Sequence, residues 1–471
     1  MGIADVGPPA SCVLTQPLSV LSPTPFWAKM SALIDFKNIF IVPAVSSLEP
    51  STVARDRNFL WHPFTQMQDW CAADPLVIVE GRGASLRDEQ GRWYLDGNSS
   101  IWTNLHGHQN ARLDAALQRQ LGRFAHSSFL GLTHAPAAAL AAELCALWPL
   151  GTLERVFFSD NGSTAIEVAL KMAVQFWQLE GNTRRRTFVA FGGAYHGDTA
   201  GAASLGGVAA FTDRFADWQF PVERVQSAEA LEELDATSIA GVVIEPLVQG
   251  ANQIRVWPPG LLAKVRAWCD RSGAFLIADE VLTGFGRTGT MFACEREGVV
   301  PDFLAVAKGL TGGYMPLAAT LTTQRVFNAF LGGPERTFYY GHSYCGHALG
   351  CAVALENLAI FREERVLERL QGQIRLLAGL LDTRLRPSPF VYEIRQCGFV
   401  VGIELRQAGG IPFDSALRMG ARVCLAAREF GLLTRPVLDT LVLMPPYCVS
   451  DAELEMSVMA LAAAIEAGCN R

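Results

Sequence analysis

Residues 241–280 contain, in order, GVVIEP (241–246), LLAKVRAWCDRSG (261–273) and FLIADE (275–280). The first and third segments are continuous apolar runs that predict strands, and the second has the apolar spacing of an amphipathic helix. Strands that are apolar along their whole length are typical of a parallel sheet covered by helices on both faces. This stretch therefore predicts an α/β fold with a mostly parallel sheet.

The same alternation continues on both sides of this stretch. Apolar runs predict strands at 155–160, 187–191 and 303–308, and helical spacing predicts helices at 163–177 and 347–363. Ligands bind at the carboxyl ends of the strands in such sheets, so polar residues at these ends are candidates for a site. The other expected elements are short strands within 76–97, helices within 111–124 and 135–148, and a C-terminal α+β region.

The first residues of the chain are expected to lie outside the fold. Residues 1–50 contain Lys29 and Lys37 but no Arg, and prolines interrupt them throughout, which fits neither a transit peptide nor a secretory signal. We expect a poorly ordered extension, with Met30 as an alternative start. The expected division of the chain is an extension at 1–55, the first part of a small domain at 56–105, a large domain at 106–350 and the rest of the small domain at 351–471.

The overall composition excludes several classes of function. The 471 residues carry a net charge of −7, which argues against nucleic acid as a main partner because phosphate binding needs a surplus of Lys and Arg. No apolar run is long enough to span a membrane. The cysteines are scattered and lack the Cys/His spacing of a zinc site, so no metal is expected. Free thiols of this kind indicate a reducing compartment, and therefore the cytoplasm.

Four polar features follow predicted strands, and the first is SDNGST at residues 159–164, where a strand passes into a helix. Gly162 permits the tight turn, and the next amides point outward at a helix N-terminus, with Ser163 and Thr164 as hydroxyl donors. These groups form a cup suited to a phosphate. Taken alone, an ordinary Ser/Thr helix cap accounts better for the motif.

The second and third features are an aromatic residue and an acid. Tyr195, in AYHG after the strand at 187–191, can stack on a flat heterocycle, although core or loop packing is the commoner role of such a ring. Asp279 ends an apolar strand, where a carboxylate is costly to bury unless it meets a cation. A protonated pyridine nitrogen is such a cation, and an ordinary ion pair or helix cap is the alternative. Arg287, in the next loop, GFGRTG, is expected at the mouth of a cleft.

The fourth feature is Lys308, which ends the apolar strand at 303–308 and precedes a glycine-rich loop. Partial desolvation lowers the pKa of such an amine and makes it nucleophilic. The alternative is a lysine that reaches past apolar neighbours to solvent. Gly309, Gly312 and Gly313 let the backbone approach a ligand closely, which favours a functional role. The four features in this order are far more specific than any one of them.

With these motifs, the chain resembles the fold-type I, class III aminotransferases from about Arg57 to Pro446. The resemblance implies an enzyme, a transaminase, that uses pyridoxal 5′-phosphate and works as a homodimer with shared active sites. It also implies a large domain with a seven-stranded, mostly parallel sheet and a smaller α+β domain formed by the N- and C-terminal segments. It rests on WHPFTQM (61–67), LDGNSSIWTNLHGH (95–108), HSSFLGLTHAP (126–136), FFSDNGSTAIEVALKMAVQFW (157–177), GAYHGDT (193–199), VVIEPLVQGA (242–251), LIADEVLTGFGRTG (276–289), AKGLTGGYMPL (307–317), GHSYCGH (341–347) and TRPVLDTLVLMPPY (434–447).

The resemblance implies a role in the cofactor site for each matching residue. Lys308 would form the Schiff base, Asp279 would pair with the pyridinium, and Tyr195 would stack on the ring; these three are the expected catalytic residues. The phosphate would be held by Gly162 and Ser163 of one subunit, and by His342 and Ser343 of the other subunit.

Within the family, HPFT near the start and RP…LMPPY near the end are similar to the branch that makes 7,8-diaminononanoate from 8-amino-7-oxononanoate in biotin biosynthesis. The amino donor of that branch is S-adenosylmethionine, or lysine in some members. Arg435, with Gly341, would hold the carboxylate of the acceptor, because a planar guanidinium suits that task. Trp102 would line the substrate channel, and Arg287 would face the donor side.

Two positions depart from the members that use S-adenosylmethionine. Those members often have Tyr where this chain has Phe64, near the substrate amine, and a Trp pair where it has Ile101 and Trp102. These differences leave the identity of the donor open between S-adenosylmethionine and lysine. The alternative function is that of another class III aminotransferase, acting on an ω-amino acid or 4-aminobutyrate.

Overall fold

The computed structural model describes residues 51–470, which belong to two compact units, Met1–Pro75 and Leu76–Arg471. The described part of the first unit contains helices α1 (Thr52–Phe59) and α2 (Met67–Ala72). The Asp56 carboxylate joins them, because it accepts a hydrogen bond from Trp70 Nε1 at 2.7 Å. The expected extension at 1–55 lies mostly outside the described residues, and its last residues form the start of α1.

A seven-stranded sheet forms the centre of the second unit, in the order β4-β12-β11-β10-β7-β5-β6. Every neighbouring pair is parallel except those made by β12, which runs antiparallel to β4 and β11. The expected mostly parallel sheet is confirmed, and the strands missed from the sequence are β12 and β6. The strands are β4 (Leu153–Ser159), β5 (Thr187–Phe191), β6 (Val222–Val225), β7 (Ile239–Ile244), β10 (Phe275–Asp279), β11 (Phe303–Val306) and β12 (Ala318–Thr323).

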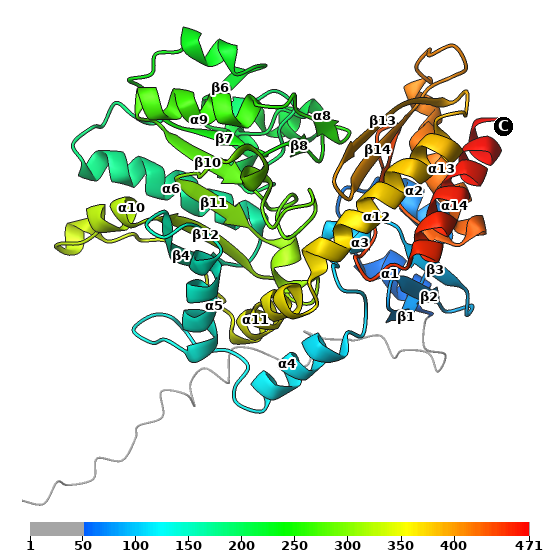
Figure 1. Cartoon of the computed structure of the whole chain (residues 1–471), viewed down its shortest axis with the longest axis horizontal. Coiled ribbons are helices and arrows are strands. Elements are labelled where there is room, and N and C mark those ends of the chain that lie inside the picture. Colours follow the sequence, from blue (N-terminus) through cyan, green and yellow to red (C-terminus); the bar gives the residue numbers. More distant parts are fainter. Residues whose placement is uncertain (1–50, 471) are drawn as a thin grey trace, which may run out of the picture. The chain divides into compact units, whose positions relative to one another are not determined.

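The central strands are buried on both faces, as their continuous apolar sequences predict. In β10, Phe275 and Ile277 pack into one core cluster with helix α6 (Gly162–Leu179), and Leu276 and Ala278 pack into a second. The second cluster includes helices α5 (Ala135–Ala146), α9 (Leu261–Ser272) and α11 (Ala348–Glu363). The sheet therefore lies between two layers of helices (Figure 1).

The second unit has two smaller four-stranded sheets, in the orders β1-β2-β3-β15 and β13-β14-β17-β16, and the first of them combines segments from both ends of the unit. Strand β15 pairs in parallel with β3, with Leu432 opposite Leu95, so segments from both ends of the second unit share a sheet. The expected domain boundaries remain a prediction. The strands of the two sheets are β1 (Ile78–Arg82), β2 (Ser85–Asp88), β3 (Trp93–Asp96), β13 (Val391–Cys397), β14 (Val400–Leu405), β15 (Leu432–Leu433), β16 (Pro436–Val437) and β17 (Thr440–Leu443).

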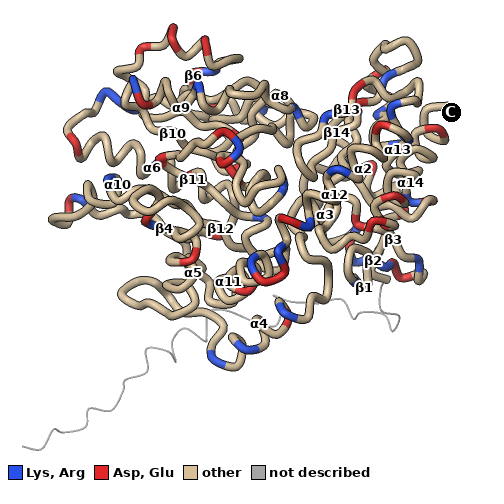
Figure 2. Tube along the Cα trace, viewed as in Figure 1, with Lys and Arg blue, Asp and Glu red and all other residues tan. Residues whose placement is uncertain are grey.

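The remaining elements are shorter or lie at the surface. They are α3 (Ser99–Trp102), α4 (Ala111–Leu121), α7 (Ala200–Ser204), α8 (Ala209–Thr212), α10 (Gln324–Ala329), α12 (Val366–Leu380), α13 (Met419–Ala427), α14 (Asp451–Cys469) and the strand pair β8 (Val248–Gln249) and β9 (Arg255–Val256). Charged residues of both signs are interspersed along the outer helices and loops (Figure 2). No helix of residues 51–470 is long and apolar enough to cross a membrane.

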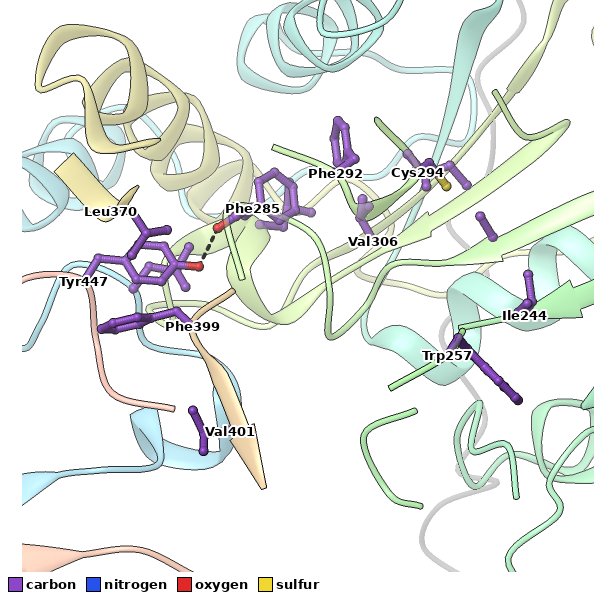
Figure 3. Packing of buried hydrophobic residues seen from close by; sticks show 14 of the residues in the cluster. Ile244, Trp257, Phe285, Phe292, Cys294, Val306, Leu370, Phe399, Val401 and Tyr447 are labelled. Atoms are coloured by element: carbon purple, nitrogen blue, oxygen red, sulfur yellow. Dashed lines mark hydrogen bonds between the residues drawn. The ribbon is translucent and has the colours of Figure 1, made fainter. Parts of the chain in front are cut away.

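One hydrophobic cluster extends from the seven-stranded sheet to the small sheets. It includes Val306 of β11, Phe285 of the loop after β10, and Phe399 and Tyr447 near β14 and β17 (Figure 3). The buried Tyr447 hydroxyl donates to the Phe285 carbonyl oxygen at 2.7 Å. The loop that follows β10 is therefore held between the two groups of strands.

Candidate active site

Four neighbouring strands place polar residues at their carboxyl ends. Asp279 is the last residue of β10, Glu245 directly follows β7, and Lys308 comes two residues after the end of β11. Tyr195 lies in the loop after β5, which pairs with β7. Because these strands run in parallel, their ends meet at one edge of the sheet, as the sequence predicts for Asp279, Lys308 and Tyr195.

The Asp279 carboxylate is held from two sides and is 5% exposed. Its Oδ1 accepts from the Val281 amide at 3.0 Å, and its Oδ2 lies 2.7 Å from Nδ1 of the buried His196. A carboxylate only accepts, so His196 carries a proton on Nδ1. Burial alone would lower the pKa of His196, but the hydrogen bond and the charge of Asp279 raise it overall. Two hydrogen bonds therefore fix the Asp279 carboxylate in place inside the protein.

Glu245 supplies a second buried carboxyl group beside this pair. Its oxygens accept from the amides of Tyr195 at 3.0 Å and Gly250 at 2.9 Å, so it ties together the loops after β5 and β7. Burial raises its pKa to about 7, with the nearby His196 opposing the shift and Asp279 adding to it. Glu245 thus holds the backbone of Tyr195 in place.

Lys308 presents its amine next to these acids. Burial lowers its pKa to about 8, although the charges of Asp279 and Glu245 act in the opposite direction. Asp279 pairs with Ala305 in the sheet, so β10 and β11 end side by side. Its Nζ also lies 4.8 Å from the centre of the Trp102 ring, a cation–π distance. The structure thus brings Lys308, Asp279 and Trp102 together.

Trp102 is held by an uncommon backbone conformation. All residues of α3 (Ser99–Trp102) have positive φ, from 46° to 69°, which makes one left-handed turn. Such a conformation costs about 1–2 kcal/mol per residue for L-amino acids. Hydrogen bonds hold it: the Ser100 amide and hydroxyl donate to Asp96 at 3.0 and 2.7 Å, and the Ser99 hydroxyl donates to the Met444 carbonyl oxygen at 2.7 Å. The strained turn directs the indole toward Lys308.

The expected phosphate cup lies where α6 begins. A capping box joins Asn161 and Thr164 at this end of the helix, where the side chain of each accepts from the backbone amide of the other. The first backbone amides of a helix have no hydrogen-bond acceptor within that helix. A Cβ on Gly162 would come within 2.7 Å of Val281, and one on Gly197 within 2.0 Å of the Ser163 hydroxyl. Both positions therefore require glycine, because Val281 and Ser163 pack directly against them at the start of α6.

The Tyr195 ring lies beside this cup. Its hydroxyl donates to Asp198 Oδ2 at 2.6 Å, and the Asp198 amide donates to the Ser163 hydroxyl at 3.2 Å. Burial, with the hydrogen bond to Asp198, raises the pKa of Tyr195, so the phenol stays protonated. Its stacking on a cofactor ring remains a prediction.

The loop that carries His342 and Ser343 reaches the cup of its own chain. His342 Nδ1 lies 2.9 Å from Asp160 Oδ2, two residues before Gly162. Ser343 is exposed, and its carbonyl oxygen accepts from His126 at 2.7 Å. The expected contribution of both residues to a second subunit's site is not tested by one chain.

Arg287 does not lie at the mouth of a cleft as expected. It is 1% exposed, and it donates to the carbonyl oxygens of Asn104 at 3.1 Å and Pro445 at 3.0 Å, with its guanidinium 5.0 Å from the Tyr447 ring. The prediction was wrong because glycines in GFGRTG suggested a flexible loop, whereas packing against Tyr447 buries it. Arg287 joins segments of the protein instead of facing solvent.

The other residues that are expected to bind substrate are exposed. Arg435, between β15 and β16, is exposed and has no carboxylate partner among residues 51–470, and Gly341 is also exposed. Phe64 belongs to the first unit, where it is 58% exposed and has φ of 51°. Their contacts with substrate remain predictions.

Three residues of the site were not identified from the sequence. Glu245 ends an apolar strand, so the argument applied to Asp279 could have found it. His196 and Asp198 flank Gly197 in the loop that was examined only for Tyr195, and no local pattern indicates which acid or hydroxyl they meet. Only the tertiary structure shows the pairs His196–Asp279 and Asp198–Ser163.

The residues present fit pyridoxal 5′-phosphate. The cofactor's aldehyde requires an amine of lowered pKa, which Lys308 supplies, and its pyridine nitrogen requires a buried acid, which Asp279 supplies. Its phosphate requires backbone amides and a hydroxyl donor, which the start of α6 supplies with Gly162 and Ser163.

The pH dependence of cofactor uptake is expected to follow the Lys308 amine. Only the neutral amine attacks an aldehyde, and its fraction falls about tenfold for each pH unit below its pKa. The rate of cofactor uptake by the cofactor-free protein should therefore rise with pH up to about pH 8 and stay constant at higher pH. Stopped-flow absorbance measures this rate, and a constant rate from about pH 6 to pH 8 would contradict the lowered pKa.

Comparison with known proteins identifies the family of this chain. The profile of the family Aminotransferase class-III matches residues 68–465. An adenosylmethionine-8-amino-7-oxononanoate aminotransferase of Geobacter sulfurreducens is 45% identical over 86% of this chain and 94% of its own. One from Nitratidesulfovibrio vulgaris is 46% identical over 90% of this chain and 83% of its own.

Solved structures give the same result. The crystal structure of an adenosylmethionine-8-amino-7-oxononanoate aminotransferase from Methanocaldococcus jannaschii matches with a TM-score of 0.85 and 36% identity, covering 88% of this chain and 98% of that one. A PLP-bound amine transaminase from an uncultivated Pseudomonas species matches with a TM-score of 0.82 and 32% identity, over 87% and 99% of the two chains. The chain belongs to the class III aminotransferases.

Proposed function

We propose that this protein is a pyridoxal-phosphate-dependent transaminase that converts 8-amino-7-oxononanoate to 7,8-diaminononanoate in biotin biosynthesis, with S-adenosylmethionine as amino donor. The observation that carries the proposal is the similarity to relatives of this name, which are 45% and 46% identical over most of both chains. The site supports it, because Lys308, Asp279 and the phosphate cup are intact. Lysine is the alternative donor.

When bound, pyridoxal phosphate supplies an aldehyde that takes up the amino group and a ring that withdraws electrons. The carboxylate of Asp279, oriented by His196, would face the pyridine nitrogen and hold a proton there. The Lys308 amine would remove the proton from the donor carbon and return one to the acceptor carbon. The Trp102 ring covers this amine and limits the approach of water.

The acceptor and the donor can be tested separately with the purified protein. We expect 7,8-diaminononanoate to form from 8-amino-7-oxononanoate and S-adenosylmethionine, as measured by mass spectrometry. Replacing S-adenosylmethionine with lysine identifies the donor, which the departures at Phe64 and Ile101 leave open. Formation of alanine from pyruvate and an ω-amino acid, with no turnover of 8-amino-7-oxononanoate, would contradict the proposal.

Replacing Arg435 with methionine should weaken binding of the acceptor carboxylate. A hydrogen bond to a charged group contributes about 1.5–3 kcal/mol, so the KM for 8-amino-7-oxononanoate should rise about 10- to 100-fold. The KM for the donor and the melting temperature should stay the same, since Arg435 is exposed and has no carboxylate partner in the described chain. The matched control is Arg375→Met, at an exposed arginine of α12. An unchanged acceptor KM would remove Arg435 from the site.

We also propose a homodimer with shared active sites. Several apolar side chains near the His342 loop are exposed, among them Leu130 at 92% and Tyr339 at 85%. If Ser343 of one subunit completes the site of the other, mixing Lys308→Ala and Ser343→Ala proteins restores one intact site per mixed dimer. Activity above that of either variant alone supports sharing, and no recovery after verified subunit exchange contradicts it.

A cytoplasmic location is proposed from the cysteines. Those among residues 51–470 are all free thiols, and several are buried in the core, such as Cys269 and Cys351. Proteins of oxidising compartments commonly pair such residues. Recovery of the activity in the cytoplasmic fraction of producing cells would test this.

A further inference from the structure

The backbone that carries Lys308 is held in a strained conformation. Lys308 has φ of 38°, in the left-handed region, and starts the 3₁₀ turn Lys308–Thr311. The turn is followed by Gly312 and Gly313, with φ of 61° and 89°. A strained residue that is not glycine persists only where its surroundings over-determine it. The question is which contacts hold this turn.

Asn357 of α11 donates hydrogen bonds to the backbone of this turn. Its side chain is 0% exposed, and its amide nitrogen lies 3.0 Å from the carbonyl oxygens of both Gly309 and Leu310. Carbonyl oxygens only accept, so the NH₂ group must face them and Oδ1 must face the other way. Asn357 therefore uses both of its donors on the turn that begins at Lys308.

His106 forms a hydrogen bond with the oxygen of the Asn357 side chain. Its Nε2 lies 2.7 Å from Asn357 Oδ1 and must be the donor, because Oδ1 only accepts. Burial lowers the pKa of His106 to about 4, so the ring is neutral near pH 7. The segment that carries His106 has a second link to the Lys308 turn, because the Leu105 amide donates a hydrogen bond to the Gly312 carbonyl oxygen at 3.2 Å.

The surroundings of Asn357 do not require a polar residue for packing. Its neighbours in α11, Val353, Ala354, Leu358 and Phe361, belong to the hydrophobic core. An apolar side chain would fill such a place without the desolvation cost of an amide. A fully bonded amide instead fixes the geometry of the groups that it contacts. Here, those groups are two carbonyl oxygens of the Lys308 turn and one imidazole.

We propose that Asn357, supported by His106, is a positioning residue that holds the Lys308 turn in its left-handed conformation, so that the amine stays against Trp102 and near Asp279. Asn357 acts through the backbone and touches neither substrate nor cofactor. The inference depends on the proposed function only in that Lys308 is the reactive amine. It is independent of the identity of donor and acceptor.

The test uses the full-length, cofactor-free protein and the chemical reactivity of Lys308. Acetic anhydride acetylates neutral amines, so labelling over a range of pH with mass spectrometry gives the pKa of the Lys308 amine without any turnover. Asn357→Asp keeps the shape but removes both donors, and Asn357→Leu removes all three hydrogen bonds. His106→Phe removes the donor to Asn357 Oδ1, and His106→Gln keeps a donor at that position. Leu358→Ala is the control for loss of core packing in the same helix.

In the two Asn357 variants and His106→Phe, we expect the pKa of the Lys308 amine to rise by about one unit or more, because the freed amine gains solvent. Loaded with pyridoxal phosphate, the same proteins should lose about 10²-fold in kcat, as expected for a misplaced reacting group. His106→Gln should retain the wild-type pKa, and Leu358→Ala should lower only the melting temperature. If an Asn357 variant does not fold, His106→Phe against His106→Gln gives the same comparison. An unchanged Lys308 pKa in the folded variants overturns the proposal, whatever the activity does.

Discussion

Replacing Lys308 with alanine is expected to abolish both the covalent attachment of the cofactor and transamination. Lys308 supplies the amine of lowered pKa in this site, and it would also transfer the proton in each half of the reaction. General acid–base groups contribute up to about 10⁴-fold to a rate, so kcat should fall by about that factor. The visible absorbance of a lysine-bound cofactor should be absent, which a spectrum of the purified protein shows directly.

Lys264 provides a matched control for this experiment. It lies in α9, is exposed, and pairs with Glu229 at 2.7 Å, so Lys264→Ala should retain the visible absorbance and the wild-type kcat. A Lys308→Ala protein that keeps the lysine-bound spectrum would show that another amine holds the cofactor. That outcome would contradict the whole assignment of the site.

Asp279→Asn is expected to have the second largest effect, because it removes the charge that would meet the pyridine nitrogen. Asparagine keeps the shape, and its single oxygen can still accept from the Val281 amide, while its NH₂ group would face Nδ1 of His196, which can accept in the other tautomer. Removing one partner of a buried charge pair costs about 3–5 kcal/mol, and about 1.4 kcal/mol is tenfold in rate. We therefore expect kcat to fall by about 10²- to 10⁴-fold, measured with saturating cofactor.

The adjacent Glu280 separates this effect from a general loss of stability. It is equally buried, but its oxygens accept from Thr283 and from the amides of Ala293 and Cys294, away from the Asp279–His196 pair. Glu280→Gln should lower the melting temperature and leave the cofactor spectrum unchanged. Equal losses of kcat in Asp279→Asn and Glu280→Gln would show that burial, and not the ring nitrogen, explains the role of Asp279.

The parts of the fold predicted from the sequence are those with strong local patterns. The apolar runs of β7, β10 and β11 and the spacing of α6 and α9 place these elements within a few residues. Strand β12, AATLTT, was missed because Ala and Thr give no apolar run, and its antiparallel direction depends on pairing with β4 and β11. Such pairing is a property of the assembled sheet and leaves little local signal.

The site residues that were predicted from the sequence are likewise those with a local pattern. Lys308 and Asp279 were predicted because each ends an apolar strand and because the four polar features occur together in one order along the chain. Arg287 was misplaced because its burial depends on Tyr447, 160 residues further along the chain. The left-handed turn Ser99–Trp102 contains no glycine, so nothing in its composition indicates positive φ. Its conformation follows from hydrogen bonds to distant residues such as Met444.

The parallel pairing of β3 with β15 has a consequence for synthesis of the protein on the ribosome. Leu95 and Leu432 are partners, so the sheet that contains β3 stays unfinished until nearly the entire polypeptide has been translated. The edge of β3 remains open during this period, and open strand edges promote association between nascent chains. Polypeptides released early, before Leu432, would keep that edge and should be substrates for chaperones and proteases.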